Sequence, residues 1–161
     1  MGSSLVPTRC FMQMTGTALR MEFGAFEQLF NADEALRRGV MNYAQYQSLL
    51  LSQIAGCNRL HDVGPRLARW LLMIQDRTGT SRLKLTQEFL GQMIGSRRTT
   101  VSAVAGTLQS RGLIEYSRGN VRILDRTGLE KTACECFGVT RQLLEGLYDQ
   151  AHQPVFDSRG D

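Results

Sequence analysis

The segment TQEFLGQMIGSRRTTVSAVAGTLQS, residues 86–110, has the pattern of two short amphipathic helices separated by a glycine. Thr86 is a good N-cap residue for the first helix. Gly95 stands where the end of that helix needs a left-handed backbone. Two short helices joined by a tight glycine turn predict a helix-turn-helix. The second helix has apolar side chains at helical spacing: Val101, Val104, Ala105 and Leu108.

The spacing of three residues inside this segment supports the same prediction. Gly91 has no side chain where the second helix must approach the first closely. Gly95 makes the turn four residues later, and Val101 enters the shared core six residues after that. Three positional matches are much more restrictive than a single glycine pattern.

The outward face of the second helix has the character of a DNA-reading surface. It begins with two arginines and continues with small residues, and residues 97–110 contain no acidic side chain. Arginine can bond guanine through two hydrogen bonds in the major groove, and small residues permit close approach to the bases. The alternative is a helix pair that serves only as a scaffold. The predicted base-reading residues are Arg97, Arg98, Thr99, Ser102 and Ala103.

A β-hairpin is expected directly after the second helix. Residues 113–116 and 121–124 are β-prone runs, and Gly119 and Asn120 lie at the tip between them. A hairpin in this place is a wing, and its arginines would bind phosphates without reading sequence. The predicted phosphate contacts are Thr86, Gln87, Thr100, Arg118 and Arg122.

The charge of the chain is concentrated around these elements. Residues 64–131 hold twelve Lys and Arg against five Asp and Glu, a net +7, whereas the rest holds seven against ten, a net −3. The two parts sum to the +4 of the whole chain. A local positive charge is expected when one module of a protein binds a polyanion and the other does not.

Length and composition exclude several classes of protein. The 161 residues fit one ordinary domain or two small ones, and we expect two. With 42% hydrophobic and 21% charged residues, disordered and fibrous classes are excluded. No apolar run approaches the ~18 residues needed to span a membrane, and no signal peptide is recognisable. We therefore expect a soluble, cytoplasmic protein without a membrane partner.

A long helix is predicted upstream, over residues 26–60, with a break at residues 31–33 where Asp33 could cap the second part. A helix of ~25 residues is ~37 Å long, which is longer than a small domain needs. Pairing with a second copy would bury its apolar stripe in a coiled-coil seam. The alternative is a core helix that packs on its own domain. The predicted dimer interface comprises Val40, Tyr43, Tyr46, Leu50, Ile54 and Cys57.

Three further segments complete the chain. Residues 9–23 alternate loosely between apolar and polar positions, which predicts a β-hairpin. Pro65 suits the first turn of a new helix, and residues 57–62 before it are the expected hinge. Residues 127–148 predict a last helix, with an irregularity at Gly138.

The stretch from residue 60 to residue 124 resembles the C-terminal DNA-binding module of the Crp/Fnr superfamily of bacterial transcription regulators. The long helix resembles the dimerisation helix of that family, and residues 9–23 resemble the last strands of its cyclic-nucleotide-binding β-roll. The residues that carry the resemblance are Leu60-His61-Asp62-Val63 with Arg66, the segment 86–101, and Gly112-Leu113-Ile114.

The resemblance implies a homodimer that binds a pseudopalindromic double-stranded DNA site, with the 97–110 helix in the major groove and RNA polymerase as a candidate partner. The family commonly reads bases with an Arg, a Glu and a second Arg. Arg98 matches the first of these, whereas Thr99 and Ala103 occupy the other two, so a different operator is expected. Only some 23 residues precede the first helix, so most of the β-roll is missing and cyclic-nucleotide binding is not expected.

The predicted fold class is mainly α with small β: a winged helix-turn-helix domain preceded by a long dimerisation helix and a short β-hairpin remnant. The expected boundaries are 1–25 for the remnant strands of a β-roll sensor domain, 26–62 for the dimerisation helix and hinge, 63–126 for the DNA-binding domain, and 127–161 for the C-terminal helix and tail.

The cysteines and histidines do not predict a metal site, a cofactor or catalysis. Two thiolates spaced as Cys134 and Cys136 point in different directions on a helix, and neither His has a suitable partner in sequence. Buried or incidental cysteines are expected instead. His61 is interpreted as hinge packing, because no nucleophile motif accompanies it, and no enzyme is expected.

Two alternative functions stay open. One is an interaction or sensor fragment that pairs with full-length relatives or completes a ligand site through the 9–23 hairpin. The other is redox sensing through the cysteines. The effector of any full-length form is unknown.

Overall fold

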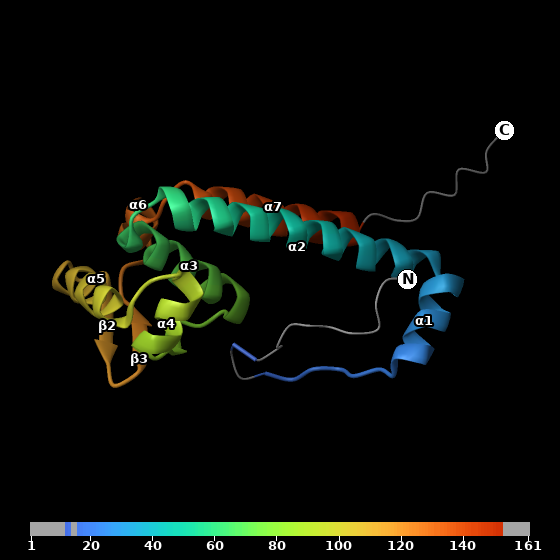
Figure 1. The fold of residues 1–161 in the computed structure, drawn as a ribbon, viewed down its shortest axis with the longest axis horizontal. Helices are drawn as coiled ribbons and strands as arrows, with labels where there is room; N and C mark the ends of the chain where they lie inside the picture. The colour runs from blue at the N-terminus through green and yellow to red at the C-terminus, as the bar shows by residue number, and fades with distance from the viewer. Residues whose placement is uncertain (1–11, 14–15, 153–161) are drawn as a thin grey trace.

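The computed structural model describes residues 12–13 and 16–152 of the chain. A long pair of helices, α2 (Glu34–Leu60) and α7 (Cys136–His152), runs along one side of the molecule. The small sheet and helices α3 to α6 gather near one end of that pair, whereas α1 lies near the other end (Figure 1). This confirms the predicted fold class of a mainly helical protein with a small β part. The elements in chain order are α1 (Phe23–Ala32), α2 (Glu34–Leu60), α3 (Val63–Thr78), β1 (Arg82–Lys84), α4 (Gln87–Ile94), α5 (Arg98–Ser110), β2 (Ile114–Ser117), β3 (Asn120–Ile123), α6 (Arg126–Thr132) and α7 (Cys136–His152).

Asp33 separates the first two helices. Its backbone is extended, with φ −106° and ψ 111°, and its carboxylate accepts a hydrogen bond of 2.9 Å from the backbone N–H of Leu36. That bond satisfies one of the free donors at the start of α2. The predicted break and its cap are confirmed.

The apolar stripe of α2 is covered by the chain itself. Tyr46, Leu50 and Cys57 are buried, and Ile54 packs against the same core. The cover comes mainly from α7, which packs along α2. The sequence pattern could not place α7 there, so the prediction that these four residues face a partner subunit is corrected.

The remaining two residues of that predicted interface differ from each other. Val40 is half-buried, whereas Tyr43 is exposed and its hydroxyl accepts a hydrogen bond from Gln47. Four of the six predicted interface residues therefore belong to an internal packing surface and not to a free seam.

The centre of the core is α3, which was predicted as the helix after Pro65. Nine consecutive residues of α3, numbered 66–74, are buried. Leu67 and Leu71 are completely covered, because α5, α6, α4 and α7 all pack around this helix. Because α3 is covered on several sides, even two of its charged residues, Arg66 and Arg69, are buried.

Three strands form an antiparallel sheet in the order β1-β3-β2. The predicted wing is the β2–β3 hairpin, in which Tyr116 pairs with Val121. The third strand, β1, was not predicted, and it pairs Leu83 with Val121 on the other side of β3. Leu83 and Val121 are both buried, so the sheet presents one apolar face to the core.

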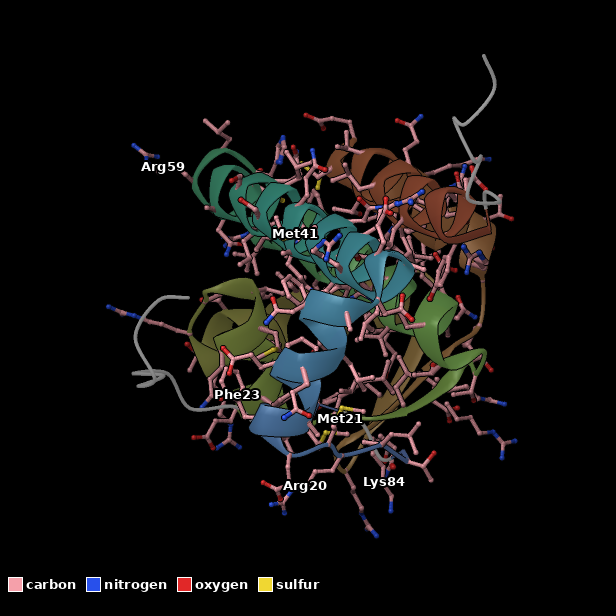
Figure 2. The ribbon with its side chains drawn as sticks, turned by 90° about the vertical axis from the view of Figure 1, so that its right-hand side faces the viewer. Arg20, Met21, Phe23, Met41, Arg59 and Lys84 are labelled. Atoms are coloured by element: carbon pink, nitrogen blue, oxygen red, sulfur yellow. The ribbon has the colours of Figure 1, made fainter. Side chains whose placement is uncertain are left out.

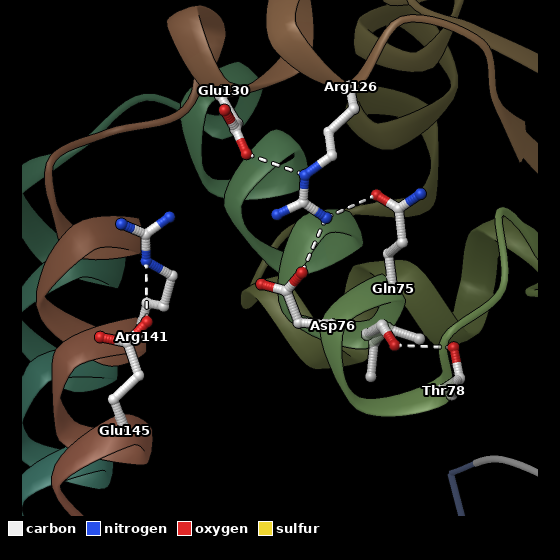
Figure 3. Close-up of polar contacts among 8 residues, drawn as sticks. Gln75, Asp76, Thr78, Arg126, Glu130, Arg141 and Glu145 are labelled. Atoms are coloured by element: carbon white, nitrogen blue, oxygen red, sulfur yellow. Dashed lines mark hydrogen bonds and ion pairs between the residues drawn. The ribbon is translucent and has the colours of Figure 1, made fainter.

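An arginine network attaches α6 to α3 (Figure 3). The guanidinium of Arg126 donates to Asp76 at 2.7 Å, to Gln75 at 3.0 Å and to Glu130 at 2.9 Å. The hydrogen bond with Asp76 is the main reason that the pKa of Arg126 is raised. These contacts hold the start of α6 against the C-terminal end of α3.

The predicted N-terminal hairpin is not formed in its described part. Residues 16–22 are extended and exposed but belong to no strand, and α1 begins at Phe23. No described segment lies beside residues 16–22 as a partner strand, so the alternating pattern has no sheet to join. The rest of the prediction falls largely on residues 9–11 and 14–15, which lie outside the described residues. Among the described helices, none combines the length and apolar character needed to cross a membrane.

Candidate nucleic-acid interface

The two helices of the helix-turn-helix begin and end as their sequence predicts. The hydroxyl of Thr86 accepts a hydrogen bond of 3.1 Å from the backbone N–H of Phe89, which caps α4. Gly95 ends α4 in the left-handed conformation, with φ 61° and ψ 46°. The chain then turns, and Arg97 occupies the N-cap position of α5.

Gly91 allows the turn to fold tightly against α4. A Cβ atom added at Gly91 would lie 2.7 Å from the carbonyl oxygen of Ser96 and 3.6 Å from the backbone nitrogen of Arg98. The carbonyl of Gly91 also accepts a hydrogen bond of 2.8 Å from the N–H of Ser96. The prediction of a close approach at this glycine is confirmed, and the closest contact is to the turn.

The second helix, α5, has one face in the core and one face in solvent. Val101, Ala105 and Leu108 are buried. Among the described residues, Arg97 and Arg98 form no ion pair, so both charges are available to a ligand. The five predicted base-reading residues are all exposed: Arg97, Arg98, Thr99, Ser102 and Ala103.

A groove of about 450 Å³ joins the start of α4, the start of α5 and the tip of the wing. It brings together Thr86, Gln87, Arg98 and Arg118, which the sequence assigned to DNA contacts from three separate segments. The side chain of Gln87 also donates a hydrogen bond of 3.1 Å to the hydroxyl of Ser102, so α4 and α5 are directly connected. Tyr116, Gly119 and one acidic residue, Glu88, complete the lining.

Tyr116 is a groove residue that the sequence reasoning missed. Its hydroxyl donates to the carbonyl of Leu85 at 3.1 Å, and its backbone N–H donates to the side chain of Gln109 at 2.7 Å. Burial raises the pKa of Tyr116, and the charge of Arg98 acts in the opposite direction. The aromatic ring therefore forms a fixed wall beside Arg98. The only sequence signal was its place at the end of a β-prone run.

Arg118 lies at the tip of the wing in an uncommon backbone conformation. Its φ is 47° and that of Gly119 is 78°, so both central residues of this two-residue turn are left-handed. Glycine or asparagine suits such a position better, because a left-handed backbone costs other L-residues roughly 1–2 kcal/mol. A charged side chain held in a disfavoured conformation is typical of a binding position.

Arg122 lies in a different environment from the one predicted. Its guanidinium pairs with Glu115 at 2.8 Å on the outer face of the sheet. It lines a second groove of about 710 Å³ with Arg82, Lys84 and Arg118, and it does not line the α4–α5 groove. Figure 2 shows Lys84 projecting from the edge of the domain that lies opposite α2.

Arg82 and Lys84 are basic residues that the sequence reasoning missed. They flank the buried Leu83 on β1, which is an alternation of exposed basic and buried apolar residues. That alternation was the available signal, but a run of three residues is too short to predict a strand by itself. Thr100, the remaining predicted phosphate contact, is exposed on α5 but does not line either groove.

Three cysteines and a histidine converge at the other end of the domain. Four atoms all lie within 4.8 Å of one another: the Sγ atoms of Cys57, Cys134 and Cys136, and a ring nitrogen of His61. The expectation that Cys134 and Cys136 point in different directions is wrong. It assumed one helix, but α6 ends at Thr132 and α7 begins at Cys136, so the break lies here and not at Gly138.

Residues 65–132 match the Crp-like helix-turn-helix domain. FixK2 from Bradyrhizobium japonicum is similar with a TM-score of 0.64 and 16% identity, over 69% of this chain and 58% of that one. A protein described as a Crp/Fnr-family transcriptional regulator from Eubacterium rectale ATCC 33656 is similar with a TM-score of 0.52 and 24% identity, over 68% of this chain and 50% of that one. The chain thus spans about half the length of these solved structures, and no curated protein matches it.

Proposed function

We propose that the chain is a transcription regulator that binds double-stranded DNA in a sequence-specific way, because residues 65–132 match the Crp-like helix-turn-helix domain. The observation that supports this most strongly is the groove that unites Thr86, Gln87, Arg98 and Arg118. Backbone and side-chain donors at the start of α4 suit phosphate oxygens, and the start of α5 suits the base edges of a major groove.

Each part of the interface has a distinct role in this proposal. Arg98 reads a base, because its charge is unpaired among the described residues and it stands in the first turn of α5. Arg118 binds a phosphate from the wing, and Arg82 and Lys84 extend the same electrostatic surface along β1. Arg122 contributes less than predicted, because Glu115 already neutralises it.

A homodimer is proposed through the face of α2 that is opposite to the buried stripe. The positions 41, 44, 48, 51 and 55 alternate in steps of three and four, which is the spacing of a coiled-coil seam. Met41 and Leu51 are 59% and 63% exposed, and the positions between and after them carry small residues. The complete proposed seam is Met41, Ala44, Ser48, Leu51 and Ala55, all of which are exposed.

In a two-fold pair of chains, the distance between the two α5 helices determines the spacing of the two DNA half-sites. Two copies of α5 related by the two-fold axis would enter successive major grooves about 34 Å apart, so the site would be a pseudopalindrome. We propose RNA polymerase as a partner of the protein–DNA complex. The proposed location of the protein is the cytoplasm. No effector is proposed for the described part of the chain.

A selection from randomised duplex DNA tests this function. The purified chain should enrich duplexes with two inverted half-sites whose centres are about 10 base pairs apart. Light scattering on the same sample should give the mass of two chains. Enrichment of no sequence above random duplex would contradict the proposed function, and a monomeric mass on enriched DNA would contradict the dimer. A mixed complex that forms only with a full-length relative would favour the interaction-fragment alternative.

A further inference from the structure

The end of α2 and the junction between α6 and α7 bring four metal-binding side chains together. Cys57 lies in the last turn of α2, and His61, four residues later, is the C-cap residue of that helix with an extended backbone. Cys134 lies in the short link between α6 and α7, and Cys136 is the first residue of α7, 77 and 79 positions after Cys57. All three thiols are buried and His61 is half-buried.

Two of the distances between these atoms match those around a single tetrahedral ion. The Sγ atoms of Cys57 and Cys134 are 3.5 Å apart, and the Sγ of Cys136 lies 3.5 Å from the Nδ1 of His61. A zinc ion with Zn–S bonds of about 2.3 Å and a Zn–N bond of about 2.0–2.1 Å holds its ligand atoms about 3.5–3.8 Å apart. All separations are within 4.8 Å, at most about 1 Å more than a tetrahedral zinc ion holds between its ligands. An iron–sulfur cluster would need additional space for its inorganic sulfides.

The neighbouring side chains orient the ligands as they do around bound metals. The Nε2 of His61 lies 3.0 Å from a carboxylate oxygen of Glu135, which leaves Nδ1 directed toward the three sulfurs. A carboxylate on the second ring nitrogen fixes the tautomer of a metal-binding histidine. The side chain of Gln53 donates a hydrogen bond of 3.1 Å to the sulfur of Cys136.

A buried arginine supplies an independent argument from charge. Arg69 is completely buried, and within the described residues its Nε and Nη2 atoms have no hydrogen-bond partner. Arg69 lies close enough to Cys57 for its charge to act on that thiol. Three neutral thiols would give this cation no counter-charge. One Zn²⁺ with three thiolates and a neutral histidine carries a net charge of −1, which balances Arg69.

We propose that Cys57, His61, Cys134 and Cys136 bind one structural Zn²⁺ ion. Four protein ligands leave no open position, so the site stabilises the fold and performs no catalysis. Each thiol releases its proton as its sulfur binds the ion, and His61 binds through neutral Nδ1. The ion ties the end of the long helix to the C-terminal helices at the hinge before α3. It would thereby fix the direction in which α2 leaves the DNA-binding domain.

The metal content of the purified full chain tests this proposal directly. After expression with added zinc and purification under reducing conditions, mass spectrometry of the elements should find one zinc per chain. Cys57→Ser and Cys134→Ser should lose that zinc. Cys10→Ser should keep it, because Cys10 is the one cysteine of the sequence that is not a proposed ligand. Cobalt added to the metal-free chain should give the visible absorption of a tetrahedral thiolate complex. A reduced wild-type chain that neither retains nor takes up zinc would overturn the proposal, as would equal loss in Cys10→Ser.

Two other chemistries of the same cluster are outcomes that would also overturn it. One is iron with acid-labile sulfide in place of zinc. The other is a Cys57–Cys134 disulfide that persists in the protein as isolated, seen as two fewer free thiols under denaturing conditions.

A variant that keeps all four ligands avoids the uncertainty of misfolded serine variants. Glu135→Gln should weaken zinc binding about tenfold in competition with a chelator, because the amide no longer stabilises the histidine as the carboxylate does. Glu145→Gln, an exposed carboxylate further along α7, is the matched control and should bind as wild type. Equal affinity in Glu135→Gln and wild type would contradict the assigned role of the His61–Glu135 contact.

Discussion

Replacing Gly91 by alanine tests the packing on which the helix-turn-helix depends. The new Cβ would lie 2.7 Å from the carbonyl oxygen of Ser96, a separation that requires the backbone of the turn to shift. Overpacking of this kind costs about 1–3 kcal/mol, and the better helix propensity of alanine returns about 0.5–1 kcal/mol. The central values of these ranges leave a net loss of about 1 kcal/mol, which lowers the melting temperature of a chain of this size by about 2–4 °C.

Gly106→Ala is the matched control for this measurement. Gly106 lies within α5 of the same motif, is exposed, and has no atom within 4 Å of the position of a new Cβ. Alanine there should stabilise the protein by about 0.5–1 kcal/mol, because glycine is a poor helix former. Thermal and urea unfolding of the two variants and wild type give the comparison. A Gly91→Ala protein as stable as wild type would refute the close approach.

Three further perturbations test other parts of the structure. Arg118→Asn should stabilise the wing by up to about 1 kcal/mol, because asparagine tolerates the left-handed turn, and should weaken binding to all duplexes alike in titrations at fixed salt. Leu51→Glu on the exposed face of α2 should give the mass of one chain in light scattering, while the equally polar change Leu49→Glu outside the proposed seam should leave two. In metal-free, reduced protein, burial raises the pKa of Cys134 to about 12, so the contribution of this thiol to the free energy of unfolding should be fully present below pH 9 and fall as the pH rises toward 12. Urea unfolding across this range with a chelator present measures the effect, and zinc should shift the loss of stability to low pH, where the ligands bind protons.

The parts of the structure that the sequence predicted are those determined by neighbouring residues. The cap at Asp33, the turn at Gly95 and the hairpin between Ser117 and Asn120 each depend on a few consecutive residues. The exposed and buried faces of α5 followed from periodicity alone. Local backbone preference and helical period are properties of the sequence itself, so these elements could be predicted.

The parts that were missed depend on contacts between distant segments. The short strand β1 is stable only because β3 pairs with it across about 40 residues of chain, which no local pattern indicates. The helix α2 has two apolar faces, and the sequence could not tell which of them α7 would cover. The larger and more regular stripe was assigned to a partner subunit, although it lies inside the chain.

The cysteine cluster shows the same limitation in a functional site. Cys134 and Cys136 were judged on the geometry of a continuous helix, and His61 was judged on its neighbours in sequence. The structure places a helix break beside the two cysteines and packs them against the end of α2. Only the packing of α7 on α2 brings the four side chains together.

The most direct test of the account is a comparison of Arg98→Ala with Arg118→Ala on the duplex obtained by selection and on its single-base-pair variants. Binding is measured by competition at several salt concentrations. Arg98→Ala should remove a preference of about 1–3 kcal/mol at one base pair of each half-site. Arg118→Ala should keep every preference and reduce the slope of affinity against salt by about 1. If Arg98→Ala instead left the preference at every base pair unchanged, α5 would not read DNA through this residue, and the central claim would be contradicted.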